Sequence, residues 1–132
     1  MYHRDAIKAY QEAEQDFLVE GADPHSLVQI LYTELTSALD RTHDALTRKD
    51  LVAKSTHITK VLSILHVLAG SLDFDRGGEV ATSLARLYEW ARRRVIETSR
   101  TNDLTPVEEV RKAIADISEA WDSIRQPGPR AA

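Results

Sequence analysis

The strongest constraint on the fold is a helical spacing of apolar residues that recurs over four segments of the chain. Within each segment, apolar residues return every three or four positions, as they do on one face of an α-helix. The few glycines and prolines lie mostly where one segment gives way to the next. We expect helices over residues 24–49, 51–73, 78–101 and 106–124. Because the connections are short, the sequence predicts an all-α, antiparallel up-down four-helix bundle.

Polar residues ahead of these segments indicate where the helices begin. Asp23 is the expected N-cap of the first helix, with Pro24 at its first position, and Asp50 is the expected cap of the second. The fourth helix carries a capping-box pattern, in which Thr105 is the cap and Glu108 reaches back to it. These signals place three of the four helix starts within a residue or two.

The chain divides into three parts around this bundle. Its 132 residues are enough for one domain with a modest core. Residues 1–22 carry a weak apolar stripe and predict a short, detachable amphipathic arm. Residues 23–125 form the expected four-helix bundle, and residues 126–132 form a disordered tail.

The second predicted helix is apolar around most of its circumference. Ile64 and Val67 widen a stripe that already runs along the whole segment. A helix of this kind must be covered on several sides. Two interpretations remain open: the N-terminal arm covers the excess apolar surface, or a partner helix or extended segment does.

Charge and hydropathy exclude several functional classes. The net charge of −4 gives no general attraction to nucleic acid, and no apolar run approaches the ~20 residues that span a membrane. The N-terminus has no continuous apolar core typical of a signal peptide, so a cytoplasmic location is expected. The absence of cysteine excludes thiol catalysis and cysteine-bound metals.

The sequence offers little support for catalytic chemistry. His43 and His57 could approach each other near one end of the bundle, but no HExxH or ExxH spacing accompanies them. We interpret the paired carboxylates as solvent-exposed surface residues. We therefore expect no enzymatic activity, no catalytic residue, no metal and no cofactor.

A signalling function is the alternative interpretation. Histidine phosphotransfer domains are also four-helix bundles, with an exposed histidine followed by xxK and a glycine. His57 and Lys60 match this pattern, but Val61 stands where the glycine is needed. A response regulator needs the small residue to approach closely, so Val61 counts against this function.

Four ordered motifs resemble those of the flagellar secretion chaperone FliS family. They are "ADPHSLVQILY", the segment "LDFDRGGEVATSLARLY", the break "TND" with the following "TPVEEV", and the closing "AW". The resemblance covers about Tyr10 to Ile124. Where family members usually have Ala-Asn, this chain has Thr98-Ser99.

The resemblance implies a non-enzymatic function. Such a protein binds the disordered C-terminal tail of flagellin in the cytoplasm, prevents premature polymerisation and delivers the subunit to the gate of the flagellar type III export apparatus. It implies no nucleic-acid partner and no insertion into a membrane. Ile7 and Tyr10 are the candidates for a covering arm. The candidates for the groove that receives the tail are Leu31, Tyr32, Leu65, Leu68, Leu72, Leu84 and Tyr88.

The paired glycines of the second motif predict a structural turn rather than a phosphate site. A phosphate-binding loop needs a preceding strand and a following Lys-Ser/Thr, and neither is present. We expect Gly77 to adopt positive φ just past the second helix and Gly78 to let the chain reverse. This turn would set the third helix beside the second and create a seam between them.

Overall fold

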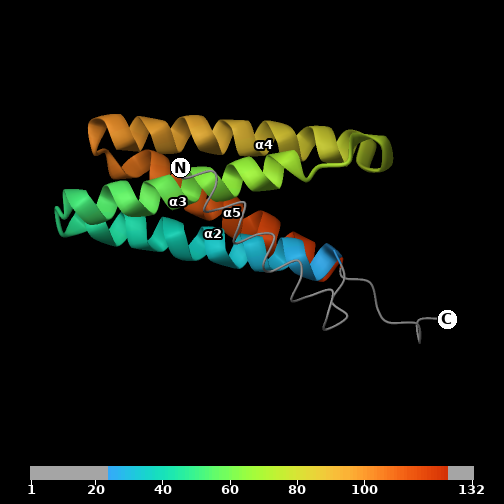
Figure 1. Ribbon diagram of the computed structural model, residues 1–132, viewed down its shortest axis with the longest axis horizontal. Coiled ribbons are helices and arrows are strands. Elements are labelled where there is room, and N and C mark those ends of the chain that lie inside the picture. The colour runs from blue at the N-terminus through green and yellow to red at the C-terminus, as the bar shows by residue number, and fades with distance from the viewer. Residues whose placement is uncertain (1–23, 125–132) are drawn as a thin grey trace.

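A computed structural model of the chain describes residues 24–124, which form four helices and no strand. In chain order they are α2 (Pro24–Thr47), α3 (Leu51–Gly70), α4 (Phe74–Thr101) and α5 (Leu104–Ser123). Each helix packs on the next, and α5 returns to pack on α2 (Figure 1). The predicted all-α four-helix bundle is confirmed.

Several predictions fall on parts of the chain that lie outside the described residues. These are the arm (1–22), the tail (126–132) and the capping role of Asp23. The partner-binding candidates Ile7 and Tyr10 lie in the arm and so belong to this group.

The connection between α3 and α4 differs from the one predicted. Helix α3 ends at Gly70 rather than near Asp73, because Ser71 caps it with backbone bonds to the preceding turn. Asp73 instead caps α4, and its Oδ1 accepts bonds from the N–H groups of Asp75 and Arg76, both at 3.1 Å. α4 therefore begins with a short helical turn at Phe74, and its continuous part follows the non-helical Gly78, where the third helix was predicted to start.

The roles expected of the two glycines are reversed. Gly78, not Gly77, has the positive φ, with φ 51° and ψ −123°. Gly77 lies in the first turn of α4, where a Cβ would come within 2.9 Å of the Ala81 Cβ. The glycine pair therefore makes a kink inside α4: Gly77 allows close packing, and Gly78 allows the bend.

The start of α5 also corrects a prediction. Asp103 caps this helix, because its Oδ1 accepts a bond from the Thr105 N–H at 2.9 Å. The predicted capping box of Thr105 with Glu108 was wrong by two residues. Asn102 ends α4 in the left-handed conformation, and the Thr98 hydroxyl donates to the Asp103 carbonyl at 2.8 Å. This compact corner starts α5 earlier than the proline alone suggested. The predicted cap of α3, Asp50, is confirmed, with its Oδ1 accepting from the Ala53 N–H at 3.0 Å.

The core runs the length of the bundle and draws on all four helices. Val80, in the first, kinked turns of α4, lies outside this core and is 64% exposed. The largest fully buried apolar side chains are Tyr32, Leu35, Leu39, Val61, Leu65, Leu68, Val95, Val107, Val110 and Ile114.

Candidate functional site

Helix α3 has unusually little charge for a helix at the surface of a bundle. Its 20 residues include two charged side chains, Lys54 and Lys60. Lys54 is buried and donates from Nζ to the Ser99 carbonyl at 2.8 Å and to Asn102 Oδ1. Lys60 pairs across to Glu34 on α2 at 3.3 Å. Both lysines are therefore engaged with neighbouring helices, and the side of α3 facing the outer edge of α4 is uncharged.

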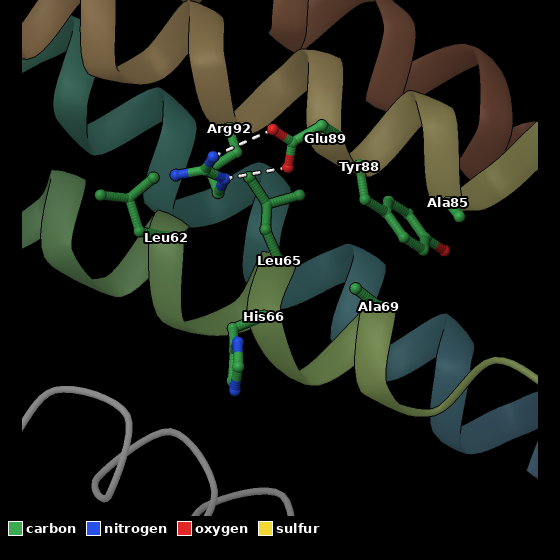
Figure 2. Close-up of a pocket in the computed structure, with 8 residues that line it drawn as sticks. All are labelled: Leu62, Leu65, His66, Ala69, Ala85, Tyr88, Glu89 and Arg92. Carbon is green, nitrogen blue, oxygen red and sulfur yellow. Dashed lines mark hydrogen bonds and ion pairs between the residues drawn. The ribbon is translucent and has the colours of Figure 1, made fainter.

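A pocket of about 480 Å³ lies along the seam between α3 and α4 (Figure 2). Each helix contributes side chains at relative positions 0, 3, 4 and 7, which is the spacing of one helical face. The pocket opens because Ala69 and Ala85 are too small to fill the space between the helices at one end. We call it the α3–α4 groove. Its lining consists of Leu62, Leu65, His66 and Ala69 from α3, and Ala85, Tyr88, Glu89 and Arg92 from α4.

The two ends of the α3–α4 groove differ in charge. At one end, Arg92 donates from Nε and Nη2 to the two carboxylate oxygens of Glu89, at 3.0 and 2.9 Å. Arg93 donates from Nε to the same carboxylate at 2.9 Å. Hydrogen bonds from Arg92 and then Arg93 lower the pKa of Glu89 to about 2. The other end carries the two alanines, so the groove is apolar with one charged end.

Beneath the groove, the hydroxyls of Tyr32 and Tyr88 form a buried hydrogen bond of 2.6 Å. These two side chains, 0% and 3% exposed, join α2 to α4 across the middle of the bundle. Burial raises the pKa of both hydroxyls, so both stay neutral at any physiological pH. The tyrosines of the two Leu-Tyr motifs thus form the floor that supports the groove.

The residues predicted for the groove, apart from Leu72, are buried in the core, and two of them also line the groove. Leu65 and Tyr88 line the groove, and Leu72 is partly buried against the core. A fully buried side chain shapes a surface but offers it little area. The buried residues that do not line the groove are Leu31, Tyr32, Leu68 and Leu84.

Sequence reasoning missed most of the lining. The prediction relied on large apolar residues, whereas two alanines create the hollow and a charged pair bounds the groove. A usable signal was present, since Leu62, Ala69, Ala85 and Arg92 fall on the matching 0, 3, 4, 7 positions of two successive helices. A seam between two helices opens where small residues on one helix lie opposite small residues on the other.

The opposite seam, between α2 and α5, is closed by polar contacts. His25 donates from Nε2 to the Trp121 carbonyl at 2.7 Å, and Trp121 donates from Nε1 to the His25 carbonyl at 3.0 Å. Their rings stack with centroids 4.7 Å apart. We call this reciprocal arrangement the His25–Trp121 clasp. It fixes the first turn of α2 to the last turn of α5.

The histidines that suggested metal or phosphotransfer chemistry have other surroundings. His43 contacts Glu108 across the α2–α5 seam at 3.1 Å. His57 is half-buried, and Lys60 pairs with Glu34 as described above. Within residues 24–124, no three metal-ligating side chains come together. In the same range, no helix is long and apolar enough to cross a membrane.

Comparison with known proteins adds independent information. The family model described as "Flagellar protein FliS" matches residues 6–128. The flagellar secretion chaperone FliS of Salmonella typhimurium is 37% identical over 125 residues, which are 94% of this chain and 93% of that protein. The flagellar secretion chaperone FliSB of Pseudomonas aeruginosa is 34% identical over 124 residues, covering 94% of this chain and 98% of that protein. The Bacillus subtilis flagellar secretion chaperone FliS is 26% identical over 116 residues, covering 88% and 86%.

Proposed function

Because the chain belongs to the FliS family of flagellar secretion chaperones, we propose that it binds the disordered C-terminal tail of flagellin in the cytoplasm. This family consists of chaperones rather than enzymes, and the chain is an export chaperone by membership. In the proposed function, tail binding prevents flagellin from polymerising early. The complex then delivers the subunit to the flagellar type III export gate.

The observation that carries this proposal is the α3–α4 groove. An amphipathic helix presents apolar side chains at positions 0, 3, 4 and 7, and both walls of the groove carry this spacing. A bound helix therefore meets a surface whose side chains have the same spacing as its own apolar side chains. Leu62 and Ala69 give one wall of apolar surface and Ala85 gives the other, with the buried ring of Tyr88 beneath them.

A disordered tail suits this site energetically. Such a segment folds as it binds and covers a large area, and the ordering entropy reduces its affinity. A chaperone that must later release its client benefits from that reduction. The apolar residues that would drive subunits together are the same ones that the groove would cover.

The proposal is tested by calorimetric titration with a C-terminal peptide of the flagellin encoded in the same genome. We expect measurable heat and a higher melting temperature at saturating peptide, because a ligand of the folded state stabilises it. No heat together with an unchanged melting temperature would sink the proposal.

A groove-filling variant locates the binding site. Ala85→Leu fills the open end of the groove, and we expect the affinity to fall at least about tenfold, equivalent to about 1.4 kcal/mol. Ala115→Leu, at an exposed alanine of α5, is the matched control and should leave the affinity unchanged. Equal affinities for the two variants would place the tail elsewhere.

The phosphotransfer alternative has less support. Val61 is fully buried, so the position that should be small and open is occupied by a core side chain. Family membership also points to a chaperone. Label transfer from a phosphorylated response regulator to His57 would be the result that revives this function.

A further inference from the structure

The charged end of the α3–α4 groove makes the site directional. Figure 2 shows Arg92 near Leu62 and bonded to Glu89, with Ala69 and Ala85 at the other end. An apolar groove with two similar ends would accept a helix in either direction. This one presents a guanidinium at a single end, so the two directions of a bound helix differ in energy.

The arginine pairing at this end leaves a positive charge unmatched. Two guanidinium groups, from Arg92 and Arg93, share the single carboxylate of Glu89. Arg92 uses Nε and Nη2 for that carboxylate, and within residues 24–124 its Nη1 donates to no side chain. The end of the groove therefore carries a surplus of one positive charge and a donor ready for a second carboxylate.

We infer that Arg92 pairs with a carboxylate of the docked segment and thereby sets its direction in the groove. This inference rests on the proposed function and adds the chemistry of the client segment: an amphipathic helix with apolar residues at 0, 3, 4 and 7, followed by an acidic residue about one turn later. The bound helix runs parallel to α4, from Ala85 toward Arg92.

The helix dipole favours the same direction. The C-terminal end of a helix carries a partial negative charge, which is stabilised by a nearby cation. A segment that ends its helix beside Arg92 places both this partial charge and its acidic side chain against the guanidinium. A segment in the reverse direction would place its partially positive N-terminus there instead.

In the free chain, Glu89 pairs with Arg92 in place of the client carboxylate. The side chains of Arg92 and Glu89 are 48% and 44% exposed, so their pairing contributes little to stability and is easily exchanged. Glu89 therefore competes with the client carboxylate for the same donors.

The inference is tested by measuring the affinity of three variants for a fluorescein-labelled C-terminal peptide of the same flagellin. Arg92→Gln should weaken binding about fivefold, the upper end for an exposed charge pair, and reduce its salt dependence. Glu89→Gln removes the competitor and should tighten binding about twofold. Arg100→Gln is the matched control: Arg100 pairs with Glu97 three residues earlier on α4, as Arg92 does with Glu89, but does not line the groove, so the affinity should stay unchanged.

The signs of the two effects decide the matter. If the Arg92–Glu89 pair only supports the local structure, Arg92→Gln and Glu89→Gln remove the same contact and shift the affinity in the same direction. That result, or an unchanged affinity for Arg92→Gln, would overturn the inference. If the unmodified chain does not bind the peptide, the proposed function itself is contradicted. Failure of the inference and failure of the proposed function are therefore distinguishable.

Direction is measured separately with a nitroxide label. The chain has no cysteine, so Thr82→Cys and Ile96→Cys give single labelling sites before Ala85 and beyond Arg92 on α4. With an isotopically labelled tail peptide, the label at position 96 should broaden resonances at the C-terminal end of the bound helix. The label at position 82 should broaden those at its N-terminal end. The reverse pattern would overturn the inferred direction.

Discussion

The α2–α5 and α3–α4 seams of this bundle use polar side chains in different ways. Across the α2–α5 seam, Arg111 pairs with Asp40 at 3.0 Å and His43 with Glu108 at 3.1 Å, in addition to the His25–Trp121 clasp. Beside the α3–α4 groove, Arg92 and Arg93 pair with Glu89 within α4 itself. The charge that does bridge α3 to the end of α4, Lys54, contacts Ser99 and Asn102 and does not line the groove. Charges that bridge two helices hold a seam closed, whereas charges paired within one helix leave the seam free to receive another.

The largest expected effect breaks the closed seam. Trp121→Ala removes the stacked ring and its bond to the His25 carbonyl, and should lower the free energy of unfolding by about 3 kcal/mol. This is the low end for an aromatic truncation, because Trp121 is only partly buried. Urea denaturation measures the change.

Trp90→Ala is the matched control for that variant. Trp90 is 38% exposed on α4, and its loss should cost less than about 1 kcal/mol. Equal losses for the two tryptophans would contradict a stabilising role for the clasp. The flagellin peptide should bind Trp121→Ala as it binds the unmodified chain, at a temperature where both are folded.

The next effect concerns the floor of the groove. Tyr88→Phe leaves the buried Tyr32 hydroxyl without its partner and should cost about 2 kcal/mol of stability. The double variant Tyr32→Phe/Tyr88→Phe should be more stable than Tyr88→Phe alone, because no buried hydroxyl is then left unpaired. Strictly additive losses would show that the hydrogen bond does not couple α2 to α4.

A smaller effect tests the kink that leads into α4. Gly78→Ala forces a side chain into φ 51° and ψ −123°, and should cost about 1 kcal/mol or more. Gly70→Ala is the control, since a Cβ there meets nothing within 4 Å and the residue is helical. The melting temperature of Gly70→Ala should equal or slightly exceed that of the unmodified chain. A destabilised Gly70→Ala with a neutral Gly78→Ala would contradict the assignment of the bend.

The smallest expected effect comes from the charge pair of Glu89 beside the groove, in contrast to the pairs that bridge the α2–α5 seam. The pKa of Glu89 is lowered from 4.5 to about 2, so the folded state holds this carboxylate ionised more strongly than the unfolded chain does. Its pairing therefore stabilises the fold above about pH 4.5, and this contribution is lost as the pH falls toward 2.

Urea midpoints measured between pH 7 and pH 2 test this linkage. The difference between the unmodified chain and Glu89→Gln should be small at pH 7 and should shrink on acidification. High salt should shrink it as well, because the pair is exposed. A difference that grows as the pH falls would contradict the sign of the pKa shift.

Sequence patterns predicted the helices well because each helix has a clear apolar period and most ends have a polar cap. The misplaced boundaries share one cause: side chains such as Asp73 and Asp103 act as caps through local geometry that competes with stronger-looking signals nearby. Thr105 looked like the better cap, but Asn102 and Thr98 fix the corner two residues earlier.

The groove was harder to predict for a different physical reason. Apolar periodicity identifies which face of a helix is covered, but not whether its own bundle or a partner covers it. Tyr32 and Leu68 satisfy the same pattern as Leu62, yet the first two are buried in the core and the third lines the groove. The hollow depends on Ala69 and Ala85 lying at the same end of the groove, and that placement depends on the register of α3 against α4.

The central claim is that the flagellin tail lies in the α3–α4 groove, and thiol protection tests it most directly. Ala69→Cys places a single thiol in the groove, and Ala115→Cys places one on the exposed face of α5. Saturating tail peptide should slow alkylation of the thiol at position 69 at least about tenfold and leave the thiol at position 115 unaffected. Binding heat with an unprotected thiol at position 69, or with protection at position 115 instead, would contradict the account.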